Sequence, residues 1–131
     1  MGEGVWFMSI SNKTKEENKF RRNILIDLDG VLNCYCGEYD EEFIPEVREG
    51  AKEFIEKLYV EDKFNLVLFT TRNILKSAKW LIDNNLYSYF SNITNVKLPA
   101  FLCIDDRALT FRGNFNDMYE EIVNFRPYWK G

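Results

Sequence analysis

Acidic, hydroxyl and basic side chains follow three apolar runs that lie far apart in this 131-residue sequence. In chain order they are Asp27 and Asp29, then Thr70, Thr71 and Arg72, and finally Asp105 and Asp106. Two carboxylates about 4 Å apart repel each other by roughly 4 kcal/mol at an effective dielectric constant near 20. A carboxylate cluster therefore needs a cation or shared protons, and an all-oxygen donor set favours Mg²⁺. We expect a magnesium site if the fold brings these residues together.

Phosphoryl transfer is the chemistry that such a site would support. Asp27 can attack phosphorus while Mg²⁺ and a lysine neutralise the phosphoryl oxygens. Asp29 can protonate the leaving group and then deprotonate the water that hydrolyses the aspartyl-phosphate. Thr70 and Thr71 offer hydroxyl and backbone N–H groups to phosphate, although Thr70 can equally cap a following helix. Lys97 precedes the third apolar run and would bring an ammonium group to the same edge.

The apolar pattern predicts the elements that must position these side chains. Continuous apolar runs predict buried strands at 24–26 and 66–69 and shorter strands at 93–96 and 101–104. Apolar residues at helical spacing predict helices over 47–58, over 74–82, and after a cap at Asp117. Strands that alternate with helices predict an α/β fold with an open parallel sheet and helices on both faces. Ligands in such sheets bind beyond the carboxyl ends of the strands.

Composition narrows both the chemistry and the compartment. The chain has no histidine, which excludes serine–histidine and cysteine–histidine catalysis and imidazole-ligated metals. Its net charge of −4 disfavours nucleic acid as a partner without excluding it. An odd number of cysteines, three, and an apolar run at Val5–Ile10 too short for a signal core or a membrane span predict a reduced, cytoplasmic protein away from membranes. We interpret residues 1–20 as an arm, either disordered or an added strand, and residues 21–131 as one domain.

Four motifs in order resemble those of the haloacid dehalogenase (HAD) superfamily, over roughly residues 23–125. They are Asp27-Leu28-Asp29-Gly30-Val31-Leu32, Phe69-Thr70-Thr71-Arg72, Lys97 and Ile104-Asp105-Asp106-Arg107-Ala108. The resemblance implies a three-layer Rossmann-like sheet, a Mg²⁺-dependent aspartyl-phosphate mechanism, Asp27 as nucleophile and Asp29 as general acid and base. It also implies Mg²⁺ held by Asp27, the backbone carbonyl of Asp29 and Asp106, the usual direct ligand, with Asp105 acting behind these ligands or through water. Which of Asp105 and Asp106 binds the ion directly stays open. Leu98 after Lys97 departs from the frequent Lys-Pro pairing.

The intervals between the motifs leave no room for the cap domain that HAD enzymes usually carry. Residues 33–43, which include Tyr35 and Tyr39, form the candidate flap. The sequence predicts a phosphatase acting on a phosphorylated small molecule, with a homo-oligomer as one way to close the site. The alternatives are a phosphoprotein or polynucleotide-end phosphatase and a non-catalytic protein that binds phosphate and metal. For Arg72 three roles stay open: contact with substrate phosphate, pairing with Asp106, or exposure to solvent.

Overall fold

The structure, a computed structural model, describes residues 21–130, so the predicted arm of residues 1–20 lies outside the described residues. Its strands and helices, with four short helical turns labelled η, follow in chain order: β1 (Asn23–Asp27), η1 (Leu28–Leu32), α2 (Ala51–Glu56), η2 (Lys57–Glu61), β2 (Asn65–Phe69), α3 (Ile74–Asp83), η3 (Tyr87–Tyr89), β3 (Phe90–Thr94), β4 (Leu102–Ile104), α4 (Phe115–Val123) and η4 (Tyr128–Lys130). Strands and helices alternate as predicted.

The four strands form one parallel sheet in the order β3-β2-β1-β4. Strand β1 is flanked on both sides, with Asp27 opposite Phe69 of β2 and Ile26 opposite Ile104 of β4. The predicted α/β class with a parallel sheet is therefore confirmed. Because all strands run the same way, the residues that follow β1, β2 and β4 meet at one edge of the sheet.

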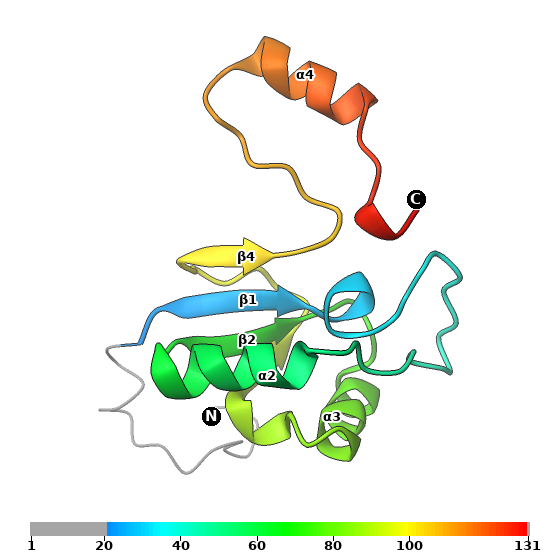
Figure 1. Cartoon of the computed structure of the whole chain (residues 1–131), viewed down its shortest axis with the longest axis vertical. Helices are drawn as coiled ribbons and strands as arrows, with labels where there is room; N and C mark the ends of the chain where they lie inside the picture. The colour runs from blue at the N-terminus through cyan, green and yellow to red at the C-terminus, as the bar shows by residue number, and fades with distance from the viewer. Residues whose placement is uncertain (1–20, 131) are drawn as a thin grey trace.

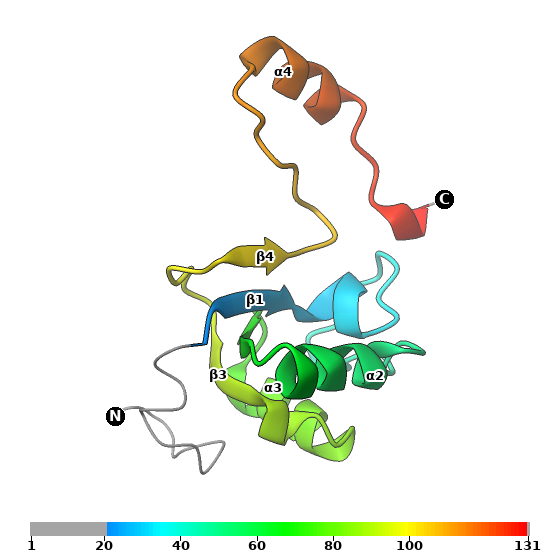
Figure 2. The same ribbon diagram turned by 60° about the vertical axis from the view of Figure 1, so that its left-hand side comes forward.

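The hydrophobic core lies between one face of the sheet and two helices. Alternate residues of β1 and β2 point to this face, including the fully buried Ile26 and Leu68, and they pack in one cluster with Ile55 of α2 and Leu81 of α3. Both helices therefore cover the same face (Figures 1 and 2). Burial of each such side chain stabilises the folded state by about 1.5–3 kcal/mol. The position of Asp27 at the end of β1 is therefore fixed by a well-packed part of the molecule.

Several element boundaries differ from those predicted. The first helix begins at Ala51 rather than at Val47, because Gly50 has a left-handed φ of 89° and interrupts the helical path. Val47 instead forms an isolated antiparallel bridge with Asn33. Strand β3 begins three residues before its predicted start. The last helix is capped by Asn114, whose side chain accepts a hydrogen bond from the backbone N–H of Asp117.

The second half of the chain is much less buried. From Thr94 to Lys130 no residue is buried, and α4 stands away from the sheet on two extended segments (Figures 1 and 2). Four large apolar side chains of α4 are exposed: Phe115, Tyr119, Ile122 and Val123. The predicted layer of helices on the second face of the sheet is therefore not seen among the described residues.

The described residues contain neither a separate cap domain nor a helix that could span a membrane. Between β1 and β2 the described chain contains a turn, a loop, α2 and η2, and it holds no separate cap domain. None of the helices within residues 21–130 has the length and apolar character needed to span a bilayer.

Candidate metal and phosphate site

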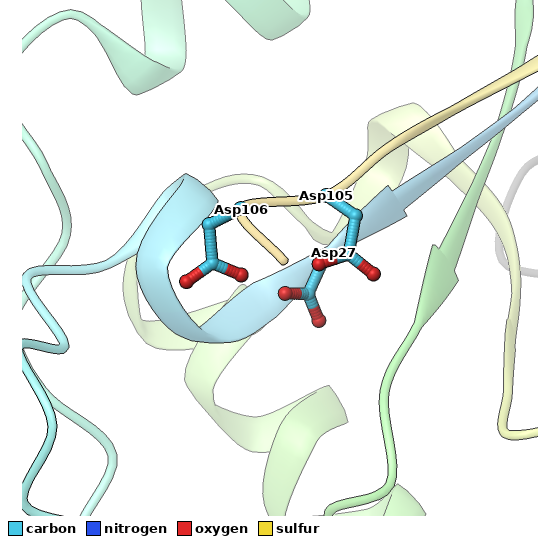
Figure 3. Close-up of side chains that lie close together, drawn as sticks. All are labelled: Asp27, Asp105 and Asp106. Atoms are coloured by element: carbon cyan, nitrogen blue, oxygen red, sulfur yellow. The ribbon is translucent and has the colours of Figure 1, made fainter. Parts of the chain in front are cut away.

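Three carboxylates converge at the carboxyl edge of the sheet. Asp27 is the last residue of β1, and Asp105 and Asp106 follow β4 on the neighbouring strand. Each carboxylate offers one oxygen, and these oxygens all lie within 4.8 Å of one another (Figure 3). The predicted convergence of residues almost eighty positions apart is therefore present. Its cause is the parallel pairing of β1 with β4.

The electrostatics of this cluster are strained when no cation compensates. The pKa of Asp27 is raised to about 8, first by burial and then by the charge of Asp105 and the side chain of Asp106, while the backbone N–H of Leu28 opposes the shift. A carboxyl group near pH 7 with such a pKa retains a proton. A divalent cation would reverse this preference, because it favours the ionised form.

The turn after β1 is built around Gly30 and Asn33. Gly30 has a φ of 84°, and a Cβ atom there would overlap the carboxylate of Asp106. The fully buried Asn33 side chain accepts hydrogen bonds from the backbone N–H groups of Gly30 and Tyr35 at 3.1 and 3.0 Å. Its amide also donates to Asp29 Oδ1 at 3.0 Å. The turn therefore carries Asp29 past the end of the strand in a fixed orientation.

Asp29 forms an ion pair with Arg72 rather than joining the three-carboxylate cluster. Arg72 Nε donates to Asp29 Oδ2 at 2.7 Å, and Arg72 Nη1 donates to the backbone carbonyl of Asp40 at 3.0 Å. The Arg72 guanidinium also lies 4.5 Å from the centre of the Tyr39 ring. Arg72 is only 5% exposed, which excludes the solvent role, and its acidic partner is Asp29 and not Asp106. It links β2, the turn after β1 and the candidate flap.

The two threonines lie at the site, whereas Lys97 does not. Thr70 is buried, and its hydroxyl accepts a hydrogen bond from the backbone N–H of Arg72 at 3.2 Å. The side chain that caps the following helix is Asn73, so Thr70 does not serve as its cap. Thr71 is exposed at the same edge. Lys97 is exposed on the connection between β3 and β4 and does not line the cleft described next.

An open cleft of about 280 Å³ joins these residues. Its lining comes from three of the four predicted motifs, Lys97 being the exception, together with two flap tyrosines: Asp27, Asp29, Tyr35, Tyr39, Phe69, Thr70, Thr71, Asp105, Asp106 and Arg107. The cleft therefore combines carboxylate and hydroxyl groups with aromatic rings.

Two aromatic residues of η4 contact the site and were not predicted. Trp129 Nε1 donates to Asp106 Oδ2 at 2.6 Å, and the Tyr128 hydroxyl donates to the Gly30 carbonyl at 2.6 Å. The donor and acceptor residues of these bonds are separated by 23 and 98 positions in the chain. No local pattern in the sequence signals contacts over such intervals.

Comparison with known proteins supports the fold alone. No protein-family model and no curated protein matches the chain. A solved structure described as that of a conserved protein coded by a locus from Bacteroides thetaiotaomicron is similar, with a TM-score of 0.53 and 24% sequence identity. The match covers 79% of this chain and 90% of the other. This chain therefore shares the α/β architecture of that bacterial protein.

Proposed function

We propose that this protein is a capless, Mg²⁺-dependent phosphohydrolase of the HAD type with a three-layer Rossmann-like fold. The observation that carries the proposal is the convergence of Asp27, Asp105 and Asp106 at the carboxyl edge of a parallel sheet. Asp29 and the two threonines border the same cleft. Carboxylates for a cation and a hydroxyl for phosphate are thus close together, as phosphoryl transfer requires.

The donor set fits Mg²⁺. Three carboxylates offer oxygen ligands, and the raised pKa of Asp27 indicates a cluster that a positive charge would stabilise. Asp27 and Asp106 would hold the cation directly, and Asp105 would bind it directly or through water. Bound there, Mg²⁺ neutralises the phosphoryl oxygens and so lowers the barrier to attack by an anionic carboxylate.

The reaction divides between Asp27 and Asp29. A carboxylate oxygen of Asp27 forms a bond to phosphorus as the ester P–O bond breaks, and the departing oxygen takes a proton from the Asp29 carboxyl group. Asp29 then accepts a proton from water, whose oxygen attacks phosphorus and releases inorganic phosphate and free Asp27. Arg72 and Asn33 each contact one oxygen of Asp29, and these contacts fix its orientation during both transfers.

A phosphorylated small molecule is the substrate class that the cleft favours. Its volume of about 280 Å³ is near the lower end of the range for small-molecule sites. The tyrosines at positions 35 and 39 provide an apolar wall for the organic part. Phosphoproteins, polynucleotide ends and phosphate binding without turnover remain as alternatives for the experiment to decide.

A panel of phosphomonoesters, assayed with Mg²⁺ and with EDTA, tests the proposal. We expect turnover that requires Mg²⁺ and that falls by at least about 10³-fold in Asp27→Asn, because the nucleophile is lost. Asp62→Asn, an exposed acidic position outside the cleft, is the matched control and should keep wild-type turnover. Turnover in Asp27→Asn equal to that of the control would refute the mechanism. Binding of Mg²⁺ and phosphate without turnover of any ester would instead favour the non-catalytic alternative.

A further inference from the structure

The segment that holds Asp106 has little packing of its own. Asp106 follows a strand of three residues, and no residue between Thr94 and Lys130 is buried. Asp27, in contrast, ends a strand whose central residues are buried. A cation between the two carboxylates requires both to be held in place, because loose ligands lose conformational entropy on binding. Another contact must therefore orient Asp106.

Trp129 makes that contact. Its indole N–H donates to Asp106 Oδ2 at 2.6 Å, a short bond of the kind expected for a charged acceptor. A carboxylate has about four lone-pair sites, so this bond leaves Asp106 with an oxygen that can bind a cation. Trp129 is not part of the cleft lining, so it acts behind Asp106 and does not face the substrate space.

The indole of Trp129 is itself contacted by two other parts of the chain, the flap and the segment after β4. The rings of Trp129 and Tyr35 form a T-shaped contact with centroids 5.4 Å apart. The Arg107 guanidinium lies 5.1 Å from the centre of the Trp129 ring. The absence of a side chain at Gly37 leaves space for the ring, since a Cβ there would lie 3.2 Å from Trp129 Cζ3. The neighbouring Tyr128 anchors the same turn through its bond to Gly30. This many contacts indicates a preferred indole position.

We propose that Trp129 is a positioning residue that orients Asp106 for the divalent cation. The inference rests on the proposed function only in that it needs the carboxylate cluster to bind Mg²⁺. A hydrogen-bond donor behind a metal-binding group typically changes metal affinity by about 10- to 100-fold. The segment 128–130 would thus complete a site whose other ligands come from the strand ends.

Magnesium affinity, measured by isothermal titration calorimetry, tests the inference without any assay of turnover. Trp129→Phe removes the N–H donor and keeps an aromatic ring, and we expect its dissociation constant for Mg²⁺ to rise about 10- to 100-fold. Trp80→Phe is the matched control, because Trp80 Nε1 also donates one hydrogen bond, at 3.0 Å to the Pro45 carbonyl, and neither residue lines the cleft. Its Mg²⁺ affinity should equal that of the wild type. Circular dichroism confirms that each variant is folded at the titration temperature.

A double variant separates orientation of Asp106 from a general structural effect. In the Asp106→Asn background, Trp129→Phe should change Mg²⁺ affinity by less than about twofold, because the group it orients is already altered. An unchanged dissociation constant in Trp129→Phe, or an equal loss in both backgrounds, would overturn the inference and leave the proposed function intact. A wild-type chain that binds no Mg²⁺ would overturn both. A chain that binds Mg²⁺ but hydrolyses no ester would refute the proposed function alone.

Discussion

The two halves of this molecule are built to different standards of packing. Strands β1, β2 and β3, with α2 and α3, bury a continuous apolar cluster, whereas no residue from Thr94 to Lys130 is buried. Leu68 in the first half is fully buried, and Ile122 in α4 is 57% exposed. The candidate site takes Asp27, Asp29 and Thr70 from the first half and Asp105 and Asp106 from the second. A site can therefore be shared between a rigid support and a segment that depends on a few specific contacts.

The difference assigns separate tasks to the two halves. The packed half fixes the position of Asp27, the proposed nucleophile, and loss of its packing would unfold the domain. The second half supplies two of the three carboxylates, so mutations there would first weaken the proposed cation site. Mutations in the packed half should therefore lower the stability of the fold, whereas mutations in the second half should lower the affinity for the metal.

The largest effect that we expect is on stability, from truncation in the packed half. Leu68→Ala should lower the free energy of unfolding by about 3 kcal/mol, because it removes buried methyl groups and leaves a cavity. Ile122→Ala, the matched truncation in α4, should lower it by less than about 0.5 kcal/mol, because that side chain already contacts water. Urea denaturation followed by circular dichroism measures both values.

A large loss in the free energy of unfolding of Ile122→Ala would contradict this difference between the two halves. A loss above about 1.5 kcal/mol would mean that the apolar surface of α4 is buried in solution, against the sheet or against a second copy of the chain. Light scattering before denaturation would then separate these two cases. A small cost at Ile122 together with a large one at Leu68 would support the division described above.

A smaller effect is expected from glycine substitutions in the packed half. Gly30→Ala and Gly50→Ala share the strain of a left-handed backbone, with φ of 84° and 89°, and each should cost about 1–2 kcal/mol. Nothing lies within 4 Å of a Cβ at Gly50, whereas at Gly30 it would overlap Asp106. Because Asp106 belongs to the loosely packed half, it should move aside. Gly30→Ala should therefore match Gly50→Ala in stability but bind Mg²⁺ at least about tenfold more weakly. Equal Mg²⁺ affinities would show that Asp106 does not need its present position.

Much of the fold was predictable because local patterns determine it. Continuous apolar runs predicted β1 and β2, and helical spacing predicted α3 nearly to the residue. The start of α2 was wrong by several residues, since the conformation of Gly50 depends on the turn before the helix. The position of α4 was not predictable either. Its apolar stripe indicates that a surface prefers burial, but not which surface covers it.

The candidate site divides in the same way. The convergence of Asp27 with Asp105 and Asp106 follows from two rules, that strand ends meet at one edge and that polar residues follow strands, and it was predicted. The pairing of Arg72 with Asp29 and the contacts of Trp129 depend on side-chain geometry between distant segments. No spacing in the sequence encodes such contacts. Lys97 shows the converse, since its place in the sequence suggested the site but it does not line the cleft.

The smallest effect concerns the pH dependence of stability, which reports on the burial of Asp27 and on its repulsion by the carboxylates of the second half. Burial, together with Asp105 and Asp106, raises the pKa of Asp27 from 3.8 to about 8. The folded state therefore binds a proton more tightly than the unfolded state. This contribution to stability is complete below pH 3.8 and is lost as the pH rises through about 8. Asp27→Asn keeps a neutral group at every pH, so relative to the wild type it should gain stability between pH 5 and pH 8. We expect a gain on the order of 1 kcal/mol, because solvent screens these partly exposed carboxylates.

Thermal denaturation at both pH values, with EDTA and with Mg²⁺, measures this gain. Mg²⁺ should stabilise the wild type more than Asp27→Asn at pH 8, because the cation favours the ionised carboxylate that the variant lacks. A parallel pH response of the two proteins in EDTA would mean that neither burial nor the charges of Asp105 and Asp106 raise the pKa of Asp27 in solution. In that case the second half of the chain would lie further from the first than the structure places it. The three carboxylates would then come together only when the cation binds.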